Sequence, residues 1–141
     1  MATQRLTKHN SAMVSSAIAL LQARNADALL ILLDGSTDWK RIVELTSDTS
    51  KPVIVALDSQ EDLEGASEAG LKTVALNKEK APLLERLQHA LLEAAADELI
   101  RTNGEVVAVY RGFQQNRLDS ISHLQLDERM RRLTSRDLQM L

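Results

Sequence analysis

Short apolar runs alternate with stretches of helical spacing along this 141-residue chain, and this alternation limits the folds open to it. The run ADALLILLD, residues 26–34, has the length of a strand and no polar face. Such a run is typical of a strand that is covered on both sides of a sheet. Buried strands separated by helices pair in parallel and are joined by right-handed crossovers. The chain is therefore predicted to be an α/β protein with three layers, in which helices cover both faces of a mostly parallel sheet.

The remaining elements follow from the same periodicity. Strands are expected at 26–34, 51–58, 71–77, 104–113 and 118–126, and helices at 10–25, 37–46, 59–70 and 81–101. The first helix has Val14, Ala17, Ile18 and Leu21 on one face, and the last has an apolar row of Leu84, Leu87, Leu91, Ala95 and Leu99. Because a tight turn at QQN joins the last two strands, the fifth strand is predicted to run antiparallel to the fourth.

Several residues mark where the helices are expected to begin. Asn10 is the expected N-cap of the first helix, and Pro82 lies near the start of the last. Ser59 and Asp62 form a cap pattern for the third helix. Trp39, on the second helix, is expected to pack in the core or in an interface.

The composition excludes several classes of function. A formal net charge of −3 with mixed signs and an aromatic content of 2% offer neither a basic surface nor stacking platforms for nucleic acid. No apolar run approaches the roughly 18 residues of a membrane span. The absence of cysteine excludes thiolate chemistry and fits a cytoplasmic protein. We therefore expect a cytoplasmic domain that binds neither nucleic acid nor membrane.

Catalytic and cofactor-binding motifs are also absent. The sequence contains no G-x-S-x-G, P-loop, G-x-G-x-x-G or H-E-x-x-H pattern. The three histidines, His9, His89 and His123, have no partner at motif spacing and are expected on the surface or in packing. Oxygen ligands for magnesium could come from Asp34, Asp38, Asp58, Glu61 and Asp62, but no D-x-D pattern gathers them. We therefore predict no catalytic residue, no metal site and no cofactor, and a chain that is not itself an enzyme.

The order of the segments carries a resemblance to a known family. A Ser36-Thr37 turn follows the first strand, and then come KPVIVAL at 51–57, AGLKTV at 69–74 and GEVVAV at 104–109. This order resembles the C-terminal domain of pyruvate kinase over about residues 10–126. The resemblance implies a strand order of 3-2-1-4-5 and a regulatory domain without catalytic residues. In some members of that family a sugar phosphate binds between the turn after the first strand and the final hairpin loop.

Two interpretations of the turn after the first strand stay open. Ligands of open α/β sheets collect where the strand order reverses, which for the implied order lies between the first and fourth strands. An anion site there would use Gly35, Ser36, Thr37, Arg111, Gly112 and Arg117. The alternative is that Ser36 or Thr37 only caps the following helix. Because the flanking Asp34 and Asp38 repel an anion, capping is the favoured interpretation.

The last stretch, DERMRRLTSRDLQML at 127–141, begins an apolar pattern that it does not complete. It resembles the linker that enters the cyclase domain of some diadenylate cyclases, the enzymes that make cyclic di-AMP, and the preceding module resembles their N-terminal part. The cyclase's own Asp-Gly-Ala and Arg-His-Arg motifs are absent. We therefore expect a domain at 1–126, a linker at 127–141, and a truncated chain whose downstream domain is a cyclase.

These observations lead to two functional hypotheses. The first is a non-catalytic regulatory or assembly domain of a nucleotide-signalling protein, which forms a dimer through the Ala- and Leu-rich helix 81–101. The second is a small-molecule sensor that binds a phosphorylated metabolite or a nucleotide at the turn after the first strand.

Overall fold

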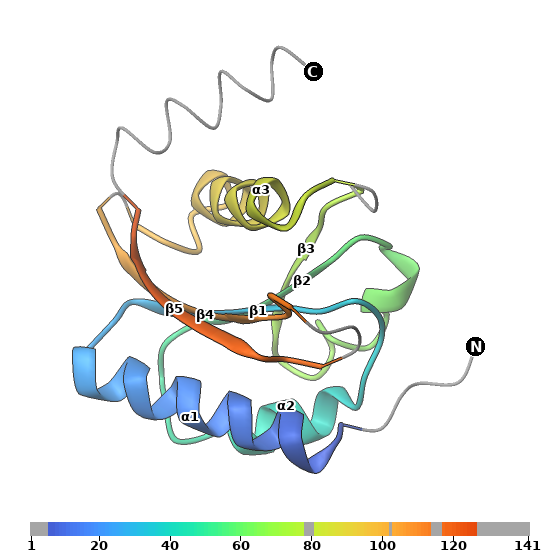
Figure 1. Ribbon diagram of the computed structural model, residues 1–141, viewed down its shortest axis with the longest axis horizontal. Coiled ribbons are helices and arrows are strands. Elements are labelled where there is room, and N and C mark those ends of the chain that lie inside the picture. Colours follow the sequence, from blue (N-terminus) through green and yellow to red (C-terminus); the bar gives the residue numbers. More distant parts are fainter. Residues whose placement is uncertain (1–5, 78–80, 102, 114–116, 127–141) are drawn as a thin grey trace.

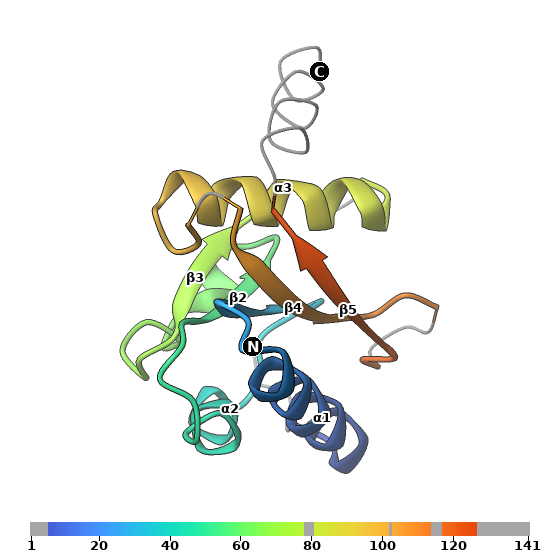
Figure 2. The ribbon, with the colours of Figure 1, turned by 90° about the vertical axis from the view of Figure 1, so that its left-hand side faces the viewer.

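A five-stranded sheet lies between two layers of helices in the computed structural model of the chain, which describes residues 6–77, 81–101, 103–113 and 117–126 (Figure 1). In chain order the elements are α1 (Lys8–Arg24), β1 (Ala28–Leu32), α2 (Trp39–Leu45), β2 (Val53–Leu57), the 3-10 helix η1 (Glu61–Leu63), β3 (Lys72–Ala75), α3 (Leu83–Ala96), β4 (Glu105–Tyr110) and β5 (Ser120–Gln125). α1 and α2 cover one face of the sheet, and α3 covers the other (Figure 2). The predicted three-layer α/β class is confirmed.

The strand order is β3-β2-β1-β4-β5, as the resemblance implied. β1 pairs in parallel with β2 and β4, and β2 pairs in parallel with β3, whereas β4 and β5 are antiparallel. The order reverses between β1 and β4, because the chain leaves β1 toward β3 and then returns over the opposite face through α3. The carboxyl ends of β1 and β4 therefore form the kind of edge at which open α/β sheets bind ligands.

The central strand β1 is buried along its whole length, as expected of a strand covered on both faces. Leu29 and Ile31 belong to the core on the α1 and α2 side, and Leu30 belongs to the core on the α3 side. The four α1 residues predicted to face inward, Val14, Ala17, Ile18 and Leu21, are all buried. Two separate apolar layers therefore hold the sheet, one on each face.

The start of α1 differs from the prediction, because the assignment of Asn10 as the N-cap is wrong. Thr7 is the N-cap, and its Oγ1 accepts a hydrogen bond from the Asn10 N–H at 3.0 Å. The Asn10 side chain instead accepts a hydrogen bond from the Leu118 N–H at 3.0 Å. Both residue types are good caps, and a contact with the distant β4–β5 hairpin decides between them.

The prediction of a helix at residues 59–70 is wrong. The segment contains the short η1 and then a series of turns. Gly65 has φ +90° and Gly70 has φ +106°, and an α-helix cannot continue through such left-handed positions. Ser59 contributes its backbone carbonyl, which accepts from the Asp62 N–H at 3.1 Å.

The last helix is shorter than predicted, because α3 ends at Ala96, with Pro82 in the N-cap position. Its buried apolar stripe consists of Leu87, Ala90, Leu91 and Ala94. Leu84 lies in the first turn, to one side of this stripe, and is 65% exposed, so its assignment to the inward row is wrong. Just beyond the end of α3, Glu98 has φ 60°, outside the helical range, so the helix does not extend to 101.

Candidate functional site

The two halves of the predicted anion site meet at the carboxyl ends of β1 and β4. Asp34 follows β1 and Arg111 follows β4, and Arg111 Nε lies 3.0 Å from Asp34 Oδ2. The guanidinium of Arg111 is therefore already paired with a carboxylate of the chain. An anion that binds here has to compete with Asp34 for Arg111.

Arg117, the second arginine of the predicted site, is held by the start of α1. Arg117 Nη2 lies 3.1 Å from His9 Nδ1, and His9 Nε2 lies 2.6 Å from the Leu118 carbonyl oxygen. Because a carbonyl can only accept, Nε2 donates and Nδ1 accepts from Arg117, which requires the neutral ring. His9 therefore fastens α1 to the β4–β5 hairpin, a role that its sequence context did not indicate.

Gly112 shapes the hairpin loop rather than the predicted site. The Asp119 carboxylate accepts hydrogen bonds from the N–H groups of Gly112 and Phe113, at 2.6 and 2.9 Å. A Cβ atom at Gly112 would lie 2.5 Å from Ser120 Oγ, so a larger residue here would require the Ser120 hydroxyl to move. Asp119, which the sequence analysis did not single out, organises this loop.

A cavity of about 60 Å³ lies between these groups. It is lined by Leu6, Thr7, Asn10, Leu32, Leu33, Asp34, Gly35, Ser36, Thr37, Arg111, Arg117 and Leu118, and so includes every predicted site residue except Gly112. Binding sites for drug-sized ligands usually have volumes of roughly 300–1,000 Å³. The cavity therefore fits a small anion or water, and a larger ligand requires Arg111 to move away from Asp34.

The capping interpretation of the turn needs a correction, because neither Ser36 nor Thr37 is the N-cap. α2 begins at Trp39, so the cap position falls on Asp38, whose Oδ1 accepts a hydrogen bond from the Arg41 N–H at 3.3 Å. Thr37 is buried and Ser36 is partly exposed. The two hydroxyls precede the cap, and they line the cavity instead.

The assignment of the cap predicts a difference between neighbouring substitutions. Asp38→Ala should lower the free energy of unfolding by about 1 kcal/mol, because the Arg41 N–H loses the side-chain acceptor that caps the helix. Ser36→Ala, the matched control, should change it by less than about 0.5 kcal/mol. Urea denaturation followed by circular dichroism measures both, and a larger loss for Ser36→Ala than for Asp38→Ala would contradict the assignment.

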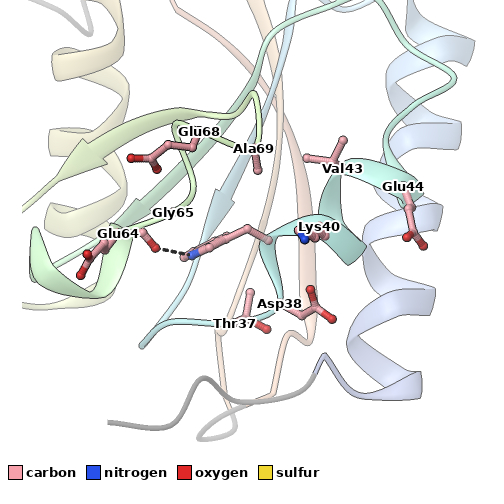
Figure 3. A pocket seen from close by; sticks show the side chains of 10 residues that line it. Thr37, Asp38, Lys40, Val43, Glu44, Glu64, Gly65, Glu68 and Ala69 are labelled. Carbon is pink, nitrogen blue, oxygen red and sulfur yellow. Dashed lines mark hydrogen bonds between the residues drawn. The ribbon is translucent and has the colours of Figure 1, made fainter.

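A larger groove of about 1110 Å³ lies beside the predicted anion site and shares Thr37 with it (Figure 3). α2 forms one wall and the turns between η1 and β3 form the other; the lining residues are Thr37, Asp38, Trp39, Lys40, Val43, Glu44, Glu64, Gly65, Glu68 and Ala69. Trp39 Nε1 donates to the Glu64 carbonyl at 3.1 Å and so joins the walls. Trp39 is only 7% exposed, which confirms its predicted packing role. No sequence signal indicated this groove, because its second wall lies where a regular helix was predicted.

The described residues contain neither a cluster of metal ligands nor a helix that could span a membrane. Among these residues, no group of three or more His, Cys, Asp or Glu side chains is arranged to hold a metal ion. The helices of the same ranges are all too short or too polar to cross a membrane.

Comparisons with known proteins agree with this architecture. A family model described as the probable sensor domain DacZ_P matches residues 9–134. A crystal structure of a pyruvate kinase from Cryptosporidium parvum is similar with a TM-score of 0.66 and 21% sequence identity, and the match covers 85% of this chain and 23% of that chain. The C. parvum pyruvate kinase in complex with ADP gives a TM-score of 0.67 at 19% identity, covering 85% of this chain and 24% of that chain. The chain thus spans about a quarter of each of these enzymes, and the likeness concerns the fold. No curated protein matches the sequence.

Proposed function

Because the chain belongs to the DacZ_P family of probable sensor domains and has the fold of the pyruvate kinase C-terminal domain, we propose that it regulates a partner domain and performs no chemistry itself. The family match over residues 9–134 is the observation that carries this proposal. The sequence supports it, because none of the common catalytic motifs is present. In this role the domain converts a binding event or an assembly state into a signal for the domain that it controls.

The controlled domain is, in this proposal, a diadenylate cyclase that follows in the intact protein, with residues 1–126 as the folded unit and 127–141 as the linker between the two. Residues 127–141 lie outside the part of the chain that the structure describes. The linker assignment therefore rests on the sequence. We also propose that the protein is cytoplasmic, because a low net charge and a lack of cysteine are consistent with that compartment. Reading the gene beyond Leu141 tests the domain order, because an open frame encoding a cyclase domain is expected there.

The second candidate function is the sensing of a phosphorylated metabolite or a nucleotide at the cavity between β1 and β4. Its support is the convergence of Arg111, Arg117 and the backbone of Gly35, Ser36 and Thr37 on one cavity. Guanidinium groups bind phosphate oxygens through charge-assisted hydrogen bonds. In this proposal the ligand competes with Asp34, whose carboxylate lies 3.0 Å from Arg111, and displaces it.

Thermal shift measurements on the 141-residue chain test this second function. Inorganic phosphate, sugar phosphates and nucleotides are the probes, and a ligand at one hundred times its dissociation constant should add about 2.7 kcal/mol of stability. Arg111→Ala should remove the shift, whereas Asp34→Asn should enlarge it at the same ligand concentration, because the competing carboxylate is gone. Arg24→Ala, a matched control, removes an arginine that pairs with Glu105 instead and should leave the shift unchanged. The absence of a shift with every probe would exclude anion sensing and leave the regulatory or assembly role.

We further propose that the domain self-associates as a dimer. Two features support this: the side chain of Leu84 on α3 is 65% exposed, and β5 is an outer strand of the sheet. An exposed apolar side chain on a helix and an outer strand are both common contact surfaces between subunits.

A further inference from the structure

The groove between α2 and the turns after η1, which we call the acidic groove, combines an apolar floor with an acidic rim (Figure 3). Its carboxylates are Asp38, Glu44, Glu64 and Glu68, against a single lysine, Lys40. Asp38 caps α2, and Glu44 pairs with Arg41 at 3.0 Å. Glu64 and Glu68, on the opposite wall, are exposed to solvent. A fitting occupant is therefore basic and carries apolar side chains for the floor.

The chain itself contains a segment of this chemistry, RMRRLTSR at residues 129–136. This is the densest run of positive charge in the sequence, because it holds four arginines and no acid. Met130 and Leu133 are three residues apart and fall on one face of a helix, so they can enter an apolar floor together. The family match continues through residue 134, so it includes most of this run.

Residues 129–136 are too close to the end of β5 to lie along the acidic groove of their own chain. They can fill the whole groove of another copy of the chain. Arg129 follows the end of β5 by only four residues, which span about 14 Å when fully extended. The acidic groove is reached from β2 and the helix layer, three strand spacings and one layer away from β5, about 17 Å in a straight line. α1 also covers the β4 side of the same face, between β5 and α2 (Figure 2).

We propose that residues 129–136 of one chain dock in the acidic groove of a second copy, and reciprocally, so that the exchange closes a two-fold dimer. The arginines face Glu64 and Glu68, and the apolar side chains lie over Val43 and Ala69. The segment that leaves one domain is thereby held by the neighbouring domain. This docking uses neither Arg111 nor Arg117 and does not depend on the regulatory or the sensing function. It assigns the contact of the proposed dimer to the acidic groove and the tail rather than to α3 or β5.

Charge reversal in the 141-residue chain tests the docking by analytical ultracentrifugation. The unaltered protein should associate reversibly toward twice the 15.6 kDa of one chain. Glu64→Lys with Glu68→Lys, or Arg131→Glu with Arg132→Glu, should each weaken the dimer by about tenfold or more, because like charges then meet. These glutamates are exposed, so the groove variant should keep the circular dichroism spectrum and melting temperature of the parent.

Two combinations make the test specific for exchange between copies. A chain that carries all four reversals should regain the dimer, because the charge pattern is inverted on both sides. An equimolar mixture of the two weakened variants should also form a dimer, since each tail then meets a groove of opposite charge. Trp39 is the only tryptophan, so its fluorescence reports the groove directly, and acrylamide should quench it more in the tail variant than in the dimeric parent.

Matched controls separate the groove from other contact surfaces. Asp97→Lys with Glu98→Lys makes the same change in net charge at exposed residues beyond the end of α3, and it should leave the dimer intact. A parent protein that stays monomeric into the high micromolar range would overturn the proposal. So would a dimer that survives both groove and tail reversals, or one that only Leu84→Glu dissociates, since that result would assign assembly to α3 instead.

Discussion

Replacing Ile31 by alanine is expected to lower the free energy of unfolding by about 3–4 kcal/mol. Ile31 is completely buried in the central strand, and it is paired in register with Val55 on β2 and Val109 on β4. Because backbone hydrogen bonds hold both neighbouring strands, the surroundings cannot collapse into the space that the side chain leaves. The loss therefore includes a cavity as well as the transfer of apolar surface to water. Urea denaturation of the variant and the parent measures the difference.

Leu84→Ala is the matched control for this prediction. It removes a similar number of methyl and methylene groups, but Leu84 is 65% exposed on α3, so the stability should change by less than about 0.5 kcal/mol. The sequence pattern assigned both Leu84 and Ile31 to apolar segments. Only the structure shows that Ile31 is buried and Leu84 is exposed. Equal losses for the two variants would mean that α3 packs on the sheet through a different face.

The strands and their burial could be predicted because a continuous apolar run has to be covered on both faces of the sheet. β1 has no polar residue on either face, so a position between two helix layers is the one that buries all of it. The inward face of α1 was equally clear, since Val14, Ala17, Ile18 and Leu21 repeat at helical spacing. The order of the strands came from the resemblance to the pyruvate kinase domain, since parallel strands with similar apolar runs do not encode their neighbours.

The contacts that shape the candidate sites could not be predicted, because they join residues that are distant in the sequence. His9 and Arg117 are 108 positions apart, and no local pattern connects them. The acidic groove depends on Gly65, whose left-handed backbone breaks a segment that otherwise reads as a helix. Local periodicity reports which side of a helix is apolar, and it does not report where a turn replaces the helix.

Arg86 is the clearest case of a residue whose role only the tertiary structure gives. It lies among the buried residues of α3 and is 5% exposed. Its Nη2 lies 2.8 Å from Oδ2 of Asp58, the residue that follows β2, and the Asp58 side chain is 20% exposed. Arg86 Nε has no hydrogen-bond partner among the described residues. A buried charge that is only partly satisfied depends strongly on its one ionic partner.

Arg86→Met is accordingly expected to lower the free energy of unfolding by about 3 kcal/mol, the lower end of the range for breaking a buried pair, because Asp58 is partly exposed. Methionine fills much of the same space, so the loss reports the missing charge rather than a cavity. Adding Asp58→Leu should recover most of the loss, since the carboxylate that needs the partner is then removed as well. The exposed pair of Arg41 and Glu44 is the control, and Arg41→Met should change the stability by less than about 0.5 kcal/mol. A double-mutant cycle measured by urea denaturation tests this prediction. If the losses in free energy of unfolding for Arg86→Met and Asp58→Leu were strictly additive, the ion pair would not couple α3 to the end of β2.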